Sequence, residues 1–314
     1  MTGNIAIVSA TDEAYLVLFE DMIRSLGDKL SAFGLVVMDL GLTDRGKDRI
    51  RSIKSDVYFL KPDWSRDFRG RDKIPEYNKV FLSKPFIPDM FTGYEGYVWV
   101  DADVWFQDVN AIQGYIEAGR TTGASFAFES HPSYQGTQKI RKLEMFGKVI
   151  IKGNKNYFMS KSVKMFGARI ASECGMQYAL NSGVFYIASG SPVWRAWQEA
   201  TLDAKIDRRW RSLQLCDQTC LQVSLLQNGL PYAIMPATYN WIPNFSSPLI
   251  DKEEYELVDP VYPNRPLKVI HLVGPKKRKY DLQCTDGRRV ETTLDWTTYQ
   301  KWKLENVSQL QAFG

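Results

Sequence analysis

The stretch "YVWVDADVWFQD", Tyr97–Asp108, sets two carboxylates one residue apart inside an apolar, β-branched and aromatic run. Such a run predicts a buried β-strand, which we expect over Tyr97–Val104. On a strand, Asp101 and Asp103 point to the same face, where the apolar residues end. Ionised carboxylates are costly in such surroundings unless a cation neutralises them. The pair therefore favours a divalent metal site at the end of a strand, although a capping aspartate beside a solvated one would give the same pattern.

Short apolar runs alternate with helical patterns along the rest of the 314-residue chain. Apolar residues with helical spacing over Glu13–Leu30 lie between two apolar runs, which predicts a strand, helix and parallel strand. We expect further helices at Val193–Ala204 and Asp217–Gly229 and near Leu294–Leu310. The other expected strands are Ile5–Ala10, Leu35–Leu40, Asp56–Leu60, Ser125–Glu129, Ser182–Ala188, Tyr232–Pro236 and Lys268–Val273. The pattern predicts a single α/β domain with a mostly parallel sheet flanked by helices, and residues 130–178 form a less periodic insertion.

Composition narrows the class of protein. A hydrophobic content of 44% and a charged content of 24% are typical of a soluble globular protein. The formal net charge of +4 favours neither nucleic acid nor any other polyanion. The N-terminus reads as a first strand rather than a signal peptide, and no apolar run is long enough to predict a transmembrane helix. The four cysteines show no zinc spacing, so we expect buried thiols and a cytoplasmic protein, with peripheral membrane association left open.

His271, one of two histidines, ends an apolar strand in "LKVIHLVGPKKRKY". A Gly-Pro turn and the basic residues Lys276, Lys277, Arg278 and Lys279 follow it. An imidazole beside a cluster of cations suits a metal ion that shares a diphosphate with basic side chains. A strand-end histidine and a solvated basic loop are the plainer interpretation of the same residues. His131, in "ESHPSY", is not followed by such a cluster of basic residues and is given no role.

Taken in order along the chain, several motifs resemble those of glycosyltransferases with the GT-A fold, and most of all the retaining, metal-dependent family 8 type. The resemblance covers residues from about 4 to 280 and implies a Rossmann-like mixed sheet. "IAIVSATDEAY" is similar to the family's first nucleotide-contacting segment, which implies that Asp12 accepts a hydrogen bond from uracil and Tyr15 stacks on the ring. "NKVFLSKPFIPDM" resembles the helix before the metal motif and implies that Lys84 contacts phosphate or the donor sugar.

The resemblance also implies the metal ligands. "VDADVWF" is similar to the family's Asp-x-Asp strand, which makes Asp101 and Asp103 ligands and Asp103 a catalytic residue. "IHLVGPKKRKY" resembles the His-x-x-Gly…Lys turn, which makes His271 the third ligand. In the same turn, Gly274 and Lys277 would contact the diphosphate. Two carboxylates and one imidazole suit Mn²⁺ better than Mg²⁺, which remains possible.

Two further motifs imply the donor-sugar site. "YALNSGVFYIAS" resembles the family's Asn-Ser-Gly-Val strand, so Asn181 and Ser182 would lie beside the sugar, with Gly183 allowing close approach. "LCDQTCL" resembles the family's Asp-Gln pair. In that pair, Asp217 would hold sugar hydroxyls and Gln218 would lie near the reacting carbon, both as catalytic residues.

The resemblance implies a single GT-A domain that transfers a hexose from a UDP-sugar to an acceptor hydroxyl on a carbohydrate or other molecule. Residues 1–105 would form the nucleotide-binding half, 106–290 the donor-sugar and acceptor half, and 291–314 a C-terminal helical tail. Tyr239, Trp241 and Phe245 would either form an aromatic platform for the acceptor or pack in the core.

Three other functions are weighed against transfer. A sugar-nucleotide pyrophosphorylase would need a glycine-rich loop after the first strand, where "SATDEAY" has no glycine. An aspartate-nucleophile phosphatase usually carries Asp-x-Asp near its N-terminus, before a Thr or Gly turn, and "DADVWF" offers neither. A module that binds a nucleotide sugar without turnover stays open.

Overall fold

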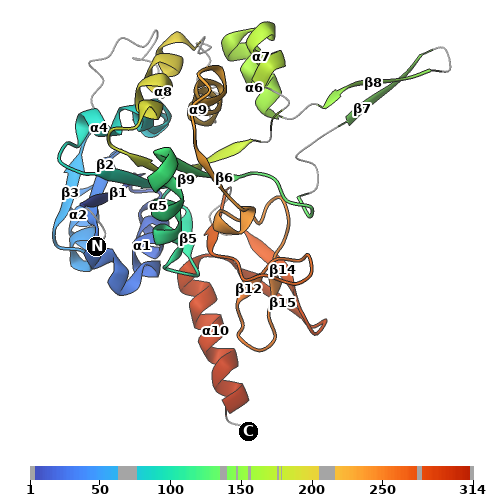
Figure 1. Cartoon of the computed structure of the whole chain (residues 1–314). Helices are drawn as coiled ribbons and strands as arrows, with labels where there is room; N and C mark the ends of the chain where they lie inside the picture. The colour runs from blue at the N-terminus through green and yellow to red at the C-terminus, as the bar shows by residue number, and fades with distance from the viewer. Residues whose placement is uncertain are drawn as a thin grey trace.

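The computed structural model describes residues 4–62, 76–134, 140–145, 148–154, 157–174, 177, 179–204, 216–273 and 278–311. Within them, a seven-stranded sheet forms the centre of the protein in the order β10-β6-β9-β4-β1-β2-β3 (Figure 1). Its strands are β1 (Ile5–Thr11), β2 (Gly34–Asp39), β3 (Val57–Leu60), β4 (Gly96–Val100), β6 (Ala124–Phe128), β9 (Leu180–Ala188) and β10 (Ala233–Met235). Neighbours are parallel except where β9 pairs with β4 and β6. The expected mixed, mostly parallel sheet is confirmed.

Helices cover both faces of this sheet, because the central strands are apolar on both sides. In β1, Ile7 packs in the core on one face and Val8 in the core on the other. The first core is closed by α1 (Leu16–Ser25), α2 (Asp44–Ile53) and α5 (Ala111–Thr122). The second is closed by α3 (Val80–Ser83), α4 (Ile87–Met90), α8 (Pro192–Asp203) and α9 (Cys216–Gln227). Short 3₁₀ helices are η1 (Gly27–Ala32), η3 (Glu76–Lys79), η4 (Lys84–Phe86) and η6 (Ala237–Tyr239).

A second, smaller layer packs beside the main sheet. The strand β5 (Val104–Phe106) pairs antiparallel with β13 (Val269–His271). A four-stranded sheet has the order β12-β11-β14-β15. Its strands are β11 (Leu249–Ile250), β12 (Leu257–Val258), β14 (Lys279–Cys284) and β15 (Arg289–Thr293), and α10 (Trp296–Gln311) follows them. The expected C-terminal helix is confirmed, and the four-stranded sheet was not expected.

The insertion at 130–178 contains regular structure that its sequence did not reveal. The hairpin of β7 (Ile140–Met145) and β8 (Lys148–Asn154) extends away from the body in Figure 1. The helices α6 (Tyr157–Phe166) and α7 (Ala168–Cys174) then pack on α9 through a small cluster that includes Phe158, Cys174 and Val223. Within the described residues, no helix has both the length and the apolar character needed to span a membrane.

The strand expected over Tyr97–Val104 is wrong in its second half. β4 ends at Val100, and the chain then turns, with Val104 N–H donating to the Asp101 carbonyl oxygen at 3.2 Å. Val104 starts β5, which leaves the main sheet to pair with β13. Asp101 N–H donates to the Gly183 carbonyl at 2.8 Å, the last hydrogen bond between this segment and β9 before the turn. The two aspartates are therefore brought together by a turn and not by strand alternation.

Candidate metal centre and its surroundings

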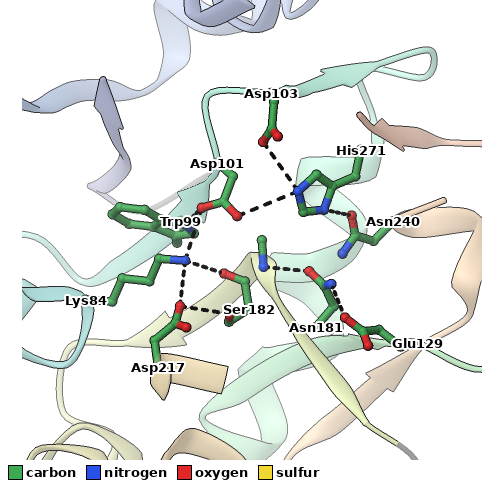
Figure 2. Close-up of polar contacts among 11 residues, drawn as sticks. Lys84, Trp99, Asp101, Asp103, Glu129, Asn181, Ser182, Asp217, Asn240 and His271 are labelled. Atoms are coloured by element: carbon green, nitrogen blue, oxygen red, sulfur yellow. Dashed lines mark hydrogen bonds and ion pairs between the residues drawn. The ribbon is translucent and has the colours of Figure 1, made fainter. Parts of the chain in front are cut away.

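Asp101, Asp103 and His271 meet at the carboxyl end of β4. Each offers one ligand atom, and these atoms all lie within 4.8 Å of one another. His271 Nε2 is 3.4 Å from Asp103 Oδ1 and 3.7 Å from Asp101 Oδ2 (Figure 2). The pairing of β13 with β5 produces this contact, because it places His271 opposite Val104. Leu272 N–H also donates to the Asp103 carbonyl at 2.9 Å, so the turn and the strand end are fixed together.

Lys84 lies beneath this cluster and links it to α9. Its side chain is 2% exposed, and its ammonium contacts Asp101 Oδ1 at 3.1 Å and Asp217 Oδ2 at 2.9 Å. The ammonium also donates to the Ser182 carbonyl at 3.1 Å and lies 4.7 Å from the centre of the Trp99 ring. Trp99 Nε1 donates to Asp101 Oδ1 at 2.7 Å. Lys84 therefore faces the metal-site aspartate from the protein side and holds its orientation.

Burial and neighbouring charges act against each other on the pKa values of the cluster. Burial would lower the pKa of Lys84, but Asp101 and Asp217 outweigh it and raise that pKa, so the ammonium stays charged. Burial raises the pKa of Asp101 despite Lys84 and His271. Burial also acts to raise the pKa of Asp103, but His271 outweighs it and the pKa is lowered.

Three carboxylates and one ammonium leave the cluster with an excess of two negative charges whenever His271 is neutral. A divalent cation would remove that excess, and two carboxylate oxygens with one imidazole nitrogen are a donor set that suits a transition metal. The residues present therefore fit the metal that the sequence predicted.

The neighbouring strand β9 contains Asn181, Ser182 and Gly183. Asn181 Oδ1 accepts from Gly183 N–H at 2.6 Å, and its Nδ2 donates to Glu129 Oε1 at 2.6 Å. A Cβ atom on Gly183 would lie 2.3 Å from His271 Cε1, so in this structure the close neighbour of the glycine is the imidazole. Sequence reasoning missed Glu129, because it was expected only as the last residue of a strand.

Asp217 and Gln218 begin α9 and are both buried. Ser182 Oγ donates to Asp217 Oδ2 at 3.0 Å, the oxygen that also pairs with Lys84. Trp197 Nε1 donates to the Asp217 carbonyl at 3.0 Å, which fixes the start of the helix. The structure thus joins Asp217 to Lys84 and Ser182, contacts that the sequence did not predict, while the roles of Asp217 and Gln218 towards a sugar stay predictions.

Asp12 and Tyr15 follow the carboxyl end of β1, which runs parallel to β4. Tyr15 N–H donates to Asp12 Oδ1 at 2.8 Å, so Asp12 closes the turn that leads into α1. The Tyr15 side chain is partly exposed. Burial raises its pKa, and so do the charges of Asp103, Asp12 and Asp101. The phenol therefore lies within the electric field of the metal-site aspartates, at an open edge of the site.

Gly274 and Lys277 lie outside the described residues, as does Lys276. Arg278, the next basic residue, donates to Asn244 Oδ1 and lies 5.2 Å from the centre of the Tyr280 ring. This arrangement ties Arg278 to the second layer.

Of the aromatic residues considered for an acceptor platform, Trp241 is fully buried, so it packs in the core. Tyr239 and Phe245 are partly buried against core clusters. His131, given no role from the sequence, binds Asp259 Oδ2 through Nε2 at 2.9 Å. Its Nδ1 accepts from Ser133 N–H at 3.2 Å. These contacts give His131 a structural part.

No protein-family profile matches this sequence, and no curated protein matches it. Solved glycosyltransferases do match its structure. The bifunctional glycosyltransferase WbbM is 14% identical with a TM-score of 0.50, and the match covers 88% of this chain and 46% of WbbM. The galactosyltransferase LgtC is 15% identical with a TM-score of 0.48, covering 86% of this chain and 87% of LgtC. GlyE of Streptococcus pneumoniae is 14% identical with a TM-score of 0.49, covering 96% and 61%.

This chain therefore spans less than half the length of WbbM, and an identity this low shows the fold alone. The GT-A fold expected from the sequence motifs is the fold that the chain has, shared with a solved glycosyltransferase.

Proposed function

We propose that this protein is a metal-dependent, retaining glycosyltransferase that moves a hexose from a UDP-sugar to an acceptor hydroxyl. The observation that carries the proposal is the Asp101–Asp103–His271 cluster at the carboxyl end of β4, beside Asn181 and Ser182. In open α/β sheets, ligands bind at the carboxyl ends of the strands. A fold shared with a solved glycosyltransferase supports the same reading.

Asp101, Asp103 and His271 would hold the metal, and Mn²⁺ fits their mixed oxygen and nitrogen donors better than Mg²⁺. When bound, the metal would stabilise the negative charge that develops on the departing diphosphate. Asp12 and Tyr15 would bind the uracil ring, and Gly274 and Lys277 would contact the diphosphate. Lys84 would hold the orientation of Asp101 and would act on the donor indirectly, through that aspartate.

Asn181, Ser182 and Asp217 would contact the donor sugar, with Gln218 near the reacting carbon. An inverting enzyme needs a carboxylate that is free to take the proton of the acceptor hydroxyl. Asp217 already pairs with Lys84 and accepts a hydrogen bond from Ser182, so its carboxylate is not free for that role. This supports retention, with the leaving phosphate helping to take that proton. The four buried free cysteines support a cytoplasmic setting.

The test is UDP release from UDP-glucose or UDP-galactose with Mn²⁺, measured for the unaltered protein and for Asp103→Ala. We expect slow release from the unaltered protein and none from the variant, with the same melting temperature in both. Asp48→Ala is the matched control, because the Asp48 side chain is 73% exposed and pairs with Arg51 on its own helix. Tight UDP-sugar binding without release would favour the binding module, and full activity in Asp103→Ala would reject the assigned site.

A further inference from the structure

The two ring nitrogens of His271 face different partners. Nε2 faces the carboxylates of Asp101 and Asp103. Nδ1 lies 3.1 Å from Oδ1 of Asn240, on the opposite side of the ring (Figure 2). His271 is 5% exposed and Asn240 is 1% exposed, so neither group can exchange its partner for water. The state of Nδ1 is therefore decided by the asparagine.

Backbone contacts hold Asn240 against this ring. Asn240 N–H donates to the Ala237 carbonyl at 2.9 Å, at the end of η6. The next residue, Trp241, accepts from His271 N–H at 2.8 Å and donates to the Val269 carbonyl at 2.9 Å. The chain segment of Asn240 is thus hydrogen-bonded directly to the strand of His271, and the side-chain contact lies within a fixed frame.

The chemistry of the two groups sets the tautomer. A carboxamide oxygen only accepts hydrogen bonds, so the Nδ1 that faces it must carry the proton. A neutral imidazole with a proton on Nδ1 has its lone pair on Nε2, the nitrogen that faces the two aspartates. The contact with Asn240 therefore leaves Nε2 ready to bind a metal ion.

The amide nitrogen of Asn240 gives a second observation about this position. Within the described residues, Asn240 Nδ2 is buried and has no hydrogen-bond partner. A buried donor without a partner destabilises the folded state. An apolar side chain of similar size would remove that donor, but it would also leave the buried Nδ1 of His271 without its acceptor, so the contact with the ring is what the asparagine provides. An aspartate would also accept from Nδ1, but it would add one more negative charge to an already acidic cluster.

We propose that Asn240 is a positioning residue that holds the proton of His271 on Nδ1 and so keeps Nε2 free as a metal ligand. The inference rests on the proposed metal site, and it goes beyond the ligand set by naming the residue that prepares one of the ligands. Partners of this kind, one contact away from the metal, usually change metal affinity 10- to 100-fold when they are removed.

The first experiment reads the tautomer directly. The chain has only two histidines, so a ¹⁵N-histidine spectrum of the metal-free protein contains only two imidazoles. His131 is an internal reference, because its Nδ1 accepts from Ser133 N–H and its Nε2 therefore carries the proton. At a pH where both rings are neutral, we expect opposite tautomers, with Nδ1–H for His271 and Nε2–H for His131. An Nε2–H tautomer for His271 would overturn the inference, whatever the tautomer of His131.

The second experiment measures Mn²⁺ alone, by titration calorimetry without any nucleotide sugar. In Asn240→Leu, which removes the acceptor and leaves the buried Nδ1 of His271 without a partner, we expect affinity to fall about 10- to 100-fold. In Asn240→Asp, which keeps an acceptor oxygen, we expect affinity to stay within about threefold at a pH above the His271 titration.

The outcomes separate this inference from the proposed function. If the unaltered protein does not bind Mn²⁺, the proposed metal site fails, and this inference fails with it. If the unaltered protein binds Mn²⁺ and Asn240→Leu binds it equally well or more tightly, only the role of Asn240 is overturned. A loss of affinity in both variants, in parallel with a lower melting temperature, would make Asn240 merely structural.

Discussion

Replacing Gly183 with alanine adds one methyl group at the point where β9 meets the imidazole of His271. That Cβ would lie 2.3 Å from His271 Cε1, 2.7 Å from Nδ1 and 2.8 Å from Asn181 Oδ1. Carbon atoms in contact normally lie about 3.5–4.0 Å apart, so the ring and the new methyl group must separate by more than about 1 Å. Because β9 lies between β4 and β6 inside the sheet, the ring is the part that we expect to move.

The size of the effect follows from how strictly a metal ion holds its ligands. Ligand distances in metal sites stay within about 0.2 Å of their usual values, so a shift of about 1 Å removes His271 from the coordination sphere. Loss of a properly oriented ligand should lower Mn²⁺ affinity at least 10- to 100-fold, which is about 1.4–2.8 kcal/mol of binding free energy.

Titration calorimetry with Mn²⁺ measures this effect, and a thermal melt of the same samples shows whether the fold survives. Gly190→Ala is the matched control, because a Cβ at Gly190 meets no atom within 4 Å. We expect the control to bind like the unaltered protein. Unaltered Mn²⁺ affinity in Gly183→Ala, together with unaltered thermal stability, would show that the imidazole is not a ligand. A large loss of thermal stability without loss of affinity would show that the strand yields instead of the ring.

Three other predictions concern the charged groups in and near the site. Lys84→Met should cost about 3–5 kcal/mol in urea unfolding, because it removes the cation that pairs with the buried carboxylate of Asp217 and the partly buried one of Asp101, whereas Lys54→Met, which breaks a pair with an exposed aspartate, should cost far less. Equal costs would contradict the buried network. Burial lowers the pKa of His271, but Asp103 outweighs it and the pKa is raised, so Mn²⁺ affinity should rise with pH through that pKa and then level off. Titrations that gave one affinity from about pH 6 to pH 9 would argue against His271 as a ligand. His131→Ala should cost about 1–3 kcal/mol of stability and leave Mn²⁺ affinity unchanged, and a change in that affinity would refute its structural role.

The sequence was sufficient to predict the main sheet and the three residues of the candidate metal cluster, and the reasons differ. Strands such as β1 are apolar on both faces, so their pattern follows from burial alone. The three expected ligands are indeed brought together, but the strand geometry used to argue for Asp101 and Asp103 was wrong. After the turn, Val104 pairs with His271, more than 160 residues later in the chain, and no local pattern around the aspartates reveals that pairing.

Contacts between distant segments also explain what sequence reasoning missed. Asn240 follows a short 3₁₀ helix in an aromatic stretch, and only the pairing of Trp241 with the strand of His271 places it beside the ring. Glu129 meets Asn181 because β6 and β9 are neighbours, with the register Ala127 opposite Asn181. A polar residue in such a stretch carries no signal of its own, since its partner is fixed by tertiary structure.

Lys84 shows how the structure changes the meaning of a residue that the sequence had already singled out. The resemblance implied that Lys84 contacts phosphate or the donor sugar, although a lysine lacks the planar, two-pronged geometry with which arginine binds phosphate. An ammonium group has three N–H donors, and Lys84 meets three oxygens of this chain, on Asp101, Asp217 and Ser182. All three donors are therefore used within the protein, and the planar guanidinium of an arginine would not match three acceptors spread around one nitrogen. Lysine at this position fits a residue that fixes the orientation of the acidic ligands, so any contact that it makes with a phosphate requires one of these three oxygens to be released.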